Sequence, residues 1–249
     1  MTRIIGIGMG EDPKKIVASI LAAGSGIRVV GYCTPETAAK IRGRVPLKES
    51  KTPEEDLSRD LFSGAIDAAV RGTLPANGTL RALKKAAGVD HLERIALLET
   101  AAGKKFLLTP VGVDEGSSVQ EKIDFVRKGT AIAEKFGLPA KAGVLSGGRL
   151  GDIGRDKKVD RSMADAELVA RITGAVHCEI LLEDAIESCG VIIAPDGISG
   201  NLIFRTLTFL GNGKGHGAPV VNIDKIFVDT SRASPDYTNA LLLAASLLD

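Results

Sequence analysis

Short apolar runs alternate with helix-start signals along this chain, and that alternation limits the fold more than any other feature. Residues 3–8 form the first apolar run, and Asp12-Pro13 follows it. Asp suits the residue before a helix, where its side chain accepts a hydrogen bond from a free N–H group, and Pro suits the first helical turn. Residues 27–32 form a second apolar run, followed by another helix start at Thr34-Pro35-Glu36. Two successive strand–helix units predict a parallel α/β sheet.

The same pattern continues through the rest of the chain. Residues 48–56 are polar and charged, so we expect them to be exposed. We expect further strands at residues 94–98, 105–110, 142–145, 191–193 and 219–223, and further helices at residues 80–87, 119–136, 162–172, 179–188 and 235–248.

The composition excludes several classes of protein. The 249 residues are 44% apolar and 25% charged, which is typical of a soluble protein with a substantial core. A net charge of +1 and the absence of Trp give no support for a nucleic acid or an acidic membrane surface as partner. No apolar run approaches the length of a membrane span, and no secretory leader is recognisable. The three cysteines and three histidines lack metal-site spacing, so we expect a cytoplasmic protein without a metal.

Glycine-rich or polar loops follow several of the predicted strands. In an open α/β sheet, ligands bind beyond the carboxyl ends of the strands. Residues 6–10 (GIGMG) match a dinucleotide fingerprint only loosely, because the third Gly is misplaced, and they favour a close backbone turn. Arg71-Gly72-Thr73 offers a guanidinium for bidentate phosphate binding, and a solvated surface arginine is the alternative.

Two later loops indicate anion binding more strongly. Ser146-Gly147-Gly148-Arg149 follows a predicted strand, and glycine lets backbone N–H groups approach an anion. Asp196-Gly197-Ile198-Ser199-Gly200-Asn201 begins a helix, whose N-terminus offers free N–H donors and a partial positive charge. Arg205, one turn further, adds a full charge, whereas Asp196 would repel phosphate and is expected to hold the loop or to take a proton. A flexible loop and an ordinary capped helix are the respective alternatives.

A fifth segment, Asp229-Thr230-Ser231-Arg232, precedes the last predicted helix. Ser231 and Arg232 side by side suit contact with an oxyanion and handling of a proton, and Asp236 lies about one turn further on. Taken alone, the segment is also typical of an N-capped helix.

Several of these segments, in the same order, resemble one superfamily. Asp196-Gly197-x-x-Gly200-Asn201-x-x-x-Arg205-Thr206 resembles a segment of the phosphate acyltransferase PlsX, and is similar to the Gly-Asn-x-x-x-Lys segment of phosphate acetyl- and butyryltransferases. Residues 219–245 resemble the closing Ser-Arg-Gly stretch and last helix of those transferases, and residues 65–83 and 131–148 are similar to two of their earlier segments. The whole pattern is most similar to the archaeal methanogenesis-marker family MtxX, which is labelled methyltransferase-related.

The resemblance implies two three-layer α/β/α subdomains around a cleft, on the isocitrate/isopropylmalate dehydrogenase-like fold of the phosphate acetyltransferases, and a homodimer. Residues 1–74 plus 223–249 would form the first subdomain and residues 75–222 the second. The implied chemistry moves an acyl group between phosphate and a thiol carrier, with phosphate or coenzyme A as substrates and no tightly bound cofactor. The residues expected to act in catalysis are Ser231, Arg232, Asp236 and Asp196. Those expected to bind substrate are Arg71, Gly72, Thr73, Ser146, Gly147, Gly148, Arg149, Gly197, Gly200, Asn201 and Arg205.

The sequence also departs from the acetyltransferase pattern. Ala233 replaces the Gly that follows Ser-Arg, and the position of a later acid is Thr238, or Tyr237 with a one-residue gap. An acidic segment of the relatives appears here as residues 177–183, with different chemistry. Phosphate binding is therefore better retained than acetyl transfer to coenzyme A. Two alternatives stay open: a methyltransferase or methyltransferase-associated protein of methanogen C1 metabolism, and a non-catalytic metabolite-binding relative.

Overall fold

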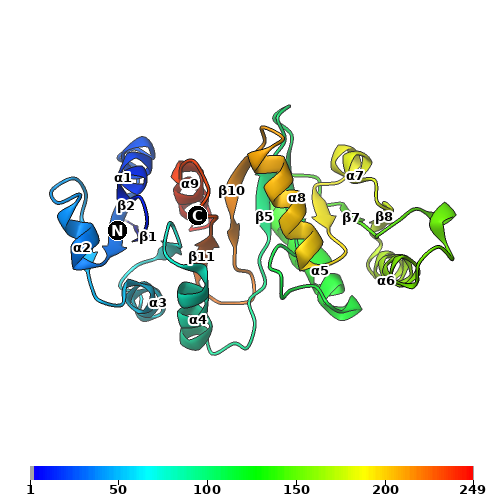
Figure 1. The fold of residues 1–249 in the computed structure, drawn as a ribbon, viewed down its shortest axis with the longest axis horizontal. Coiled ribbons are helices and arrows are strands. Elements are labelled where there is room, and N and C mark those ends of the chain that lie inside the picture. The colour runs from blue at the N-terminus through cyan, green and yellow to red at the C-terminus, as the bar shows by residue number, and fades with distance from the viewer. Residues whose placement is uncertain (1–2, 249) are drawn as a thin grey trace. The chain divides into compact units, whose positions relative to one another are not determined.

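The computed structural model describes residues 3–248, which divide into two compact units (Figure 1). The first unit consists of the chain up to Leu92 and from His216 onwards, and the second is Glu93–Gly215. These divisions differ from those expected from the resemblance, at 74/75 and 222/223. The helix after residue 74 stays with the first unit because its Leu83 is fully buried in that unit's core.

The first unit is a largely parallel sheet. Its strands have the order β3-β2-β1-β4-β11-β10. All neighbours from β3 to β11 are parallel, and β10 is antiparallel to β11. The elements are β1 (Ile4–Met9), α1 (Pro13–Ala22), β2 (Arg28–Cys33), α2 (Pro35–Ala39), β3 (Leu47–Glu49), α3 (Pro53–Ser63), β4 (Ala68–Val70), α4 (Ala76–Ala87), β10 (Lys214–Pro219), β11 (Ile226–Asp229) and α9 (Thr238–Ser246).

Helices cover both faces of this sheet: α1 and α9 lie on one face and α3 and α4 on the other (Figure 1). The helix starts predicted at Asp12 and Thr34 are confirmed, since each side chain accepts a hydrogen bond from the backbone three residues later. Under α3 and α4 lies an apolar core that includes Leu57, Leu61 and Phe227, all with 0% exposure. The unit is thus a three-layer α/β/α sandwich.

Two expectations for the first unit were wrong. The strand expected at residues 219–223 is instead β10, which ends at Pro219, and the sequence analysis missed β11, which pairs with β4 in the middle of the sheet. Residues 48–56 are not uniformly exposed: they contain part of β3 and the start of α3, and Asp56 is only 8% exposed. The Asp56 carboxylate forms an ion pair with Arg59 one turn later, so a charged residue is tolerated at a buried helix position.

The second unit has a sheet of order β5-β6-β9-β7-β8. β5 and β6 are antiparallel, and β6, β9, β7 and β8 run parallel to their neighbours. The elements are β5 (Ala96–Glu99), β6 (Lys105–Thr109), α5 (Val119–Lys135), β7 (Ala142–Val144), a 3-10 turn (Leu150–Asp152), α6 (Lys157–Thr173), β8 (Val176–His177), α7 (Leu182–Ser188), β9 (Val191–Ile193) and α8 (Gly197–Phe209).

Helices α5 and α6 pack together on one face of this sheet, and α7 and α8 lie on the other (Figure 1). The helix expected at residues 119–136 is confirmed, and Ser118 and Glu121 form a reciprocal cap at its start. Val191, Ile192 and Ile193 of β9 are completely buried at the centre. Both units therefore have the α/β/α architecture that the sequence predicts. Within residues 3–248, none of the helices combines the length and hydropathy of a membrane span.

Candidate functional site

Three predicted loops of the first unit meet at the carboxyl edge of its sheet. They follow β1, β4 and β11, which are adjacent and parallel. The backbone N–H of Gly10 donates to Thr73 Oγ1 at 2.9 Å, and the Thr230 hydroxyl donates to the Gly72 carbonyl at 3.0 Å. Gly72 has a φ of +59°, and a Cβ atom there would collide with the Gly8 carbonyl oxygen, so glycine is required for this close approach.

Arg71 lies beneath these loops rather than at the surface. Its side chain is 6% exposed; Nε donates to Asp229 Oδ1, and Nη1 donates to the Leu74 carbonyl at 2.9 Å. The backbone N–H of Thr230 donates to the same Asp229 oxygen at 2.8 Å. Sequence reasoning did not select Asp229 as a site residue, although its place at the end of a buried strand was a usable signal. The pair fixes the end of β11 relative to β4.

Ser231 and Arg232 follow this buried pair and face solvent more directly. The Arg232 side chain is 47% exposed, and its Nη1 lies 3.2 Å from Oε1 of Glu11, whose side chain is 77% exposed. Ser231 Oγ accepts a hydrogen bond from the Ala233 N–H at 3.2 Å. Its own hydroxyl proton therefore stays available for an acceptor. Asp236 uses Oδ1 to accept the N–H of Thr238, the first residue of α9, at 3.0 Å.

Two residues that sequence reasoning did not select hold this turn in place. The Tyr237 hydroxyl donates towards the carbonyls of Ser231 and Arg232, at 3.0 and 3.2 Å. Lys15 donates from Nζ to the Ser234 carbonyl at 2.9 Å and lies over the Tyr237 ring. Burial raises the pKa of Tyr237 to about 12, so the phenol stays protonated at neutral pH.

In the second unit, the predicted Asp-Gly-x-x-Gly-Asn segment begins α8. Asp196 Oδ1 accepts the Ser199 N–H at 2.7 Å. A Cβ atom at Gly197 would collide with the Gly112 carbonyl, and one at Gly200 with the Pro110 carbonyl. Asn201 completes the packing, because its Nδ2 donates to the Val111 carbonyl at 3.0 Å. The glycines and the asparagine therefore press α8 against the loop that follows β6.

That loop, residues 110–115, is held by a buried ion pair. Arg94 Nε lies 2.6 Å from Oε1 of Glu115, whose side chain is 2% exposed. Burial raises the pKa of Glu115, against the opposing effects of Arg94 and of the backbone N–H groups of Gly112 and Arg94. Neither charged residue was a site candidate from the sequence. Their contacts tie the 110–115 loop to Arg94, which precedes β5.

Arg205 does not turn towards the start of α8. Its guanidinium lies over the Phe209 ring, 5.3 Å from the ring centroid and one turn closer to the C-terminal end of the helix. Arg205 is exposed on the surface of the unit. In this conformation the Asp196 carboxylate offsets the partial positive charge at the start of α8, and Arg205 adds no positive charge there.

The Ser146-Gly147-Gly148-Arg149 loop is held by its own contacts. The Gly147 N–H donates to Ser162 Oγ at 3.0 Å, and the Arg149 N–H donates to Asp152 Oδ2 at 2.9 Å. Ser146 is 1% exposed, and its hydroxyl lies 3.0 Å from the Gly148 carbonyl. Arg149 itself is exposed. Ser162 and Asp152 thus accept backbone N–H groups of the loop that we expected to bind an anion.

A hydrogen-bonded chain of three side chains extends from this loop. His177 Nε2 lies 3.0 Å from Ser146 Oγ, and Nδ1 lies 3.3 Å from Glu167 Oε2. The guanidinium of Arg171, and then His177, lower the pKa of Glu167. Sequence reasoning did not select His177 as a site residue. Only the pairing of β7 with β8 places its imidazole beside Ser146.

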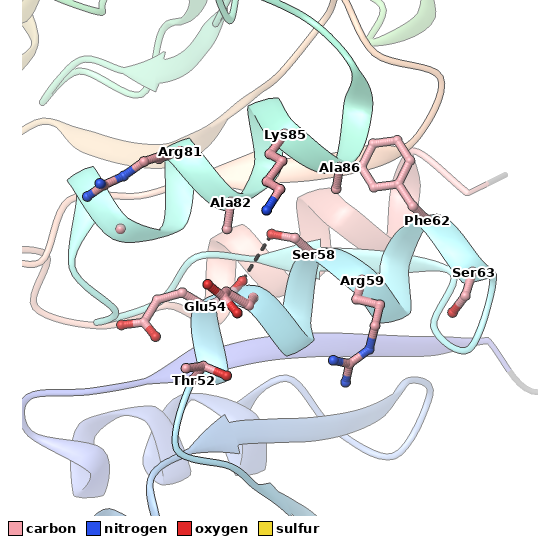
Figure 2. A pocket seen from close by; sticks show the side chains of 12 residues that line it. Thr52, Glu54, Ser58, Arg59, Phe62, Ser63, Arg81, Ala82, Lys85 and Ala86 are labelled. Atoms are coloured by element: carbon pink, nitrogen blue, oxygen red, sulfur yellow. Dashed lines mark hydrogen bonds between the residues drawn. The ribbon is translucent and has the colours of Figure 1, made fainter.

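The first unit also has a surface groove of about 970 Å³ between α3 and α4 (Figure 2). Phe62 lies at one end of the groove and Thr52 at the other, with charged side chains of both signs between them (Figure 2). None of the predicted site residues lines it. Within residues 3–248, no group of three His, Cys, Asp or Glu side chains is placed to hold a metal ion.

The fold defined by these elements is that of the phosphotransacylases. A branched-chain phosphotransacylase from Enterococcus faecalis superposes with a TM-score of 0.79, at 16% identity and 99% coverage of both chains. The EutD phosphotransacetylase from Staphylococcus aureus gives a TM-score of 0.67, at 16% identity, covering 100% of this chain and 94% of that one. Identities this low show the fold alone.

The sequence shows the family more narrowly. A protein of Methanosarcina barkeri named "Putative methyltransferase mtx subunit X" is 46% identical over 213 residues, which cover 84% of this chain and 79% of that protein. The chain therefore belongs to the mtx subunit X family, as the resemblance predicts. No family model matches the chain.

Proposed function

We propose that this protein is a transferase of the phosphate acyltransferase type, which acts on an acyl phosphate, an acyl thioester or a related phosphorylated metabolite. The observation that supports this most is the half-buried Ser231 beside the exposed Arg232 at the carboxyl end of β11. Arg232 forms an ion pair with Glu11, whose own side chain is 77% exposed. An exposed ion pair of this kind is weak, so an incoming oxyanion displaces Glu11 at low cost.

The chemistry follows from the donors at this turn. In acyl transfer from an acyl phosphate, the acceptor thiol loses its proton, its sulfur attacks the carbonyl carbon, and the carbonyl oxygen becomes an oxyanion. The Arg232 guanidinium and the free proton of the Ser231 hydroxyl are donors for that oxyanion or for the departing phosphate. One carboxylate oxygen of Asp236 accepts the Thr238 N–H, and the other is the proton acceptor in this scheme.

Arg71 has a different role in this proposal. Its guanidinium is committed to Asp229 and to the Leu74 carbonyl, both inside the unit. It therefore acts as a positioning residue, which holds the turn that carries Ser231 and Arg232. Gly72 and Thr73 act in the same way, through their contacts with Thr230 and Gly10.

Thermal unfolding in the presence of candidate ligands tests the proposal, because a ligand that binds the native state raises the midpoint. Phosphate, acetyl phosphate, coenzyme A and acetyl-coenzyme A are compared for the unmodified protein and for Arg232→Ala. Loss of part of this stabilisation in the variant, together with thioester formation by the unmodified protein from acetyl phosphate and coenzyme A, supports the proposal. Full activity of Arg232→Ala would remove Arg232 from it.

A second candidate is methyl transfer, or assistance to a methyltransferase. The observation in its favour is the name of the relative from Methanosarcina barkeri, at 46% identity. S-adenosylmethionine and a methylated corrinoid protein are the probes that separate this candidate from the first. Stabilisation by one of them, with no response to phosphate or coenzyme A compounds, would favour methyl transfer. Binding of a phosphorylated metabolite without any turnover would instead mark a binding protein.

A further inference from the structure

Lys122, in the first turns of α5, has a largely buried side chain whose ammonium group has no partner among the described residues. The residue is 6% exposed. Within residues 3–248, no hydrogen bond or ion pair reaches its ammonium group. Every fully buried polar side-chain atom of these residues has a hydrogen-bond partner, so the Lys122 ammonium keeps a small opening to solvent. A largely desolvated ammonium with such an opening is suited to bind an anion that reaches it.

The charged groups around Lys122 come from two neighbouring elements and from its own helix. Asp165 and Arg161 lie on α6, Asp196 lies between β9 and α8, and Glu121 precedes Lys122 on α5. Burial lowers the pKa of Lys122, while Asp165 and Asp196 oppose that effect. The two carboxylates favour the ammonium from a distance but do not contact it.

Both of those carboxylates already have partners. Asp165 Oδ1 lies 2.9 Å from Arg161 Nε, and Asp196 Oδ1 accepts the Ser199 N–H at 2.7 Å. Asp196 is therefore occupied as the cap of α8. The unpartnered ammonium of Lys122 is thus a separate observation from the helix start at Asp196.

The surroundings of Lys122 lie where α/β sheets bind ligands. α5 follows β6 and α8 follows β9, and these strands are adjacent and parallel, so both helix starts lie at the carboxyl edge of the sheet. The loop after β7 reaches the same part of α6, because the Gly147 N–H donates to Ser162 Oγ. Since Ser162 accepts that bond, its own hydroxyl proton is available to a further acceptor.

We infer that Lys122 is the central cation of a phosphoryl-binding site at the carboxyl edge of the second unit. A phosphoryl group presents several acceptor oxygens, so one oxygen accepts from Lys122 while others reach donors on α6, Arg161 and Ser162. Lysine binds phosphate as a compact point charge, without the fork geometry of arginine. This site is separate from the Ser231-Arg232 turn of the first unit, and it stands or falls independently of the proposed acyl transfer.

Binding of inorganic phosphate to the full chain, followed by thermal unfolding and calorimetry, tests this inference. Lys122→Met keeps the length and apolar stem of the side chain and removes the charge. We expect it to weaken phosphate binding about 10- to 100-fold, the range of a charge-assisted hydrogen bond. We also expect its phosphate-free midpoint to equal or exceed that of the unmodified protein, because a largely buried charge without a protein partner has been removed.

Matched variants make the result specific. Lys135→Met removes an exposed lysine from the same helix and should change neither quantity. Arg232→Ala should leave the binding that depends on Lys122 intact, which separates this site from the proposed catalytic turn. The inference is overturned if Lys122→Met destabilises the phosphate-free protein and leaves phosphate binding unchanged. It is equally overturned if the unmodified protein binds no phosphate.

Sulfate extends the test to pH, because sulfate does not titrate near neutrality. The protonated amine of Lys122 binds the anion, so sulfate affinity should fall as the pH rises through the lowered pKa of Lys122. Lys122→Arg keeps its charge at every accessible pH and should remove this dependence. An identical pH profile in both proteins would contradict the role of the amine.

Discussion

The hydroxyl of Ser146 lies between the imidazole of His177, 3.0 Å from Nε2, and the carbonyl of Gly148, also 3.0 Å away. The hydroxyl has a single proton, so it donates to one of these groups only. If it donates to Gly148, then Nε2 carries a proton and donates to Ser146. Nδ1, on the other side of the ring, lies 3.3 Å from Glu167 Oε2.

We therefore expect Ser146→Ala to loosen the glycine-rich loop. Removing the hydroxyl leaves a buried imidazole nitrogen without its partner, which should lower the free energy of unfolding by about 1–3 kcal/mol. Urea denaturation measures the change. Ser188→Ala is the matched control, because Ser188 is exposed and its hydroxyl contacts only sequence neighbours, the Asp184 carbonyl and the Cys189 sulfur. An equal, small effect in both variants would argue against a role for the Ser146 contact.

The buried pair of Arg71 and Asp229 should behave as one unit. Asp229→Asn leaves the Arg71 guanidinium buried beside a neutral group, and we expect a loss of about 3–5 kcal/mol in the free energy of unfolding. Arg71→Met alone should cost a similar amount. The double variant should cost much less than the sum of the two. Additive losses in chemical denaturation would show that the two side chains are not coupled.

Gly200 should tolerate no side chain. A Cβ atom there would meet the Pro110 carbonyl, which is backbone and cannot move aside without displacing the residue 110–115 loop. We expect Gly200→Ala to lower the unfolding free energy by about 1–3 kcal/mol or more. Gly26→Ala is the control, because nothing lies within 4 Å of a Cβ atom at that position. Equal midpoints for the two variants would contradict the packing described for α8.

Glu11 should compete with anions for Arg232. Glu11→Gln removes an exposed carboxylate 3.2 Å from the guanidinium. Because exposed pairs are worth up to about 1 kcal/mol, we expect phosphate or acetyl phosphate to bind up to about fivefold more tightly at the first unit. Calorimetric titration measures this. Glu36→Gln, which removes an exposed carboxylate paired with Lys40, should have no effect. Weaker binding in Glu11→Gln would point to a direct role for Glu11.

Because the pKa of Tyr237 is raised, we expect the free energy of unfolding to fall at alkaline pH. Its pKa in the folded protein is raised to about 12 from an ordinary value of 10.0. A raised pKa stabilises the fold fully below the unfolded value, and that stabilisation is lost as the pH rises through the folded value. We expect Tyr237→Phe to reduce the fall in unfolding free energy between about pH 10 and 12. A residual fall is expected from Tyr32, whose pKa burial also raises.

Local patterns predicted much of the fold but not the site contacts. Features that depend only on neighbours in sequence could be predicted, such as the Asp-Pro and Thr-Pro helix starts and the apolar run of β9. β11 was missed because its four residues follow a short connection from β10 and carry no helix-start signal before Ser231. The resemblance supplied the order of the segments.

The site contacts were harder to predict than the fold because they join distant parts of the chain. Arg71 and Asp229 meet only when β4 pairs with β11, and the sequence around either residue does not indicate the other as its partner. Likewise His177 reaches Ser146 only through the pairing of β7 and β8. Lys122 was not selected because a lysine on an amphipathic helix ordinarily faces water, and its burial depends on the packing of α5 against α6.

The first unit is assembled from both ends of the chain, with β11 inserted beside β4 after the whole of Glu93–Gly215 has been made. During translation, the second unit is complete in sequence before the first has its interior strand. The nascent β4 then presents an unpaired edge, and Arg71 has no carboxylate beside it until Asp229 leaves the ribosome. The first unit is therefore the part of the molecule most in need of protection while it is being synthesised.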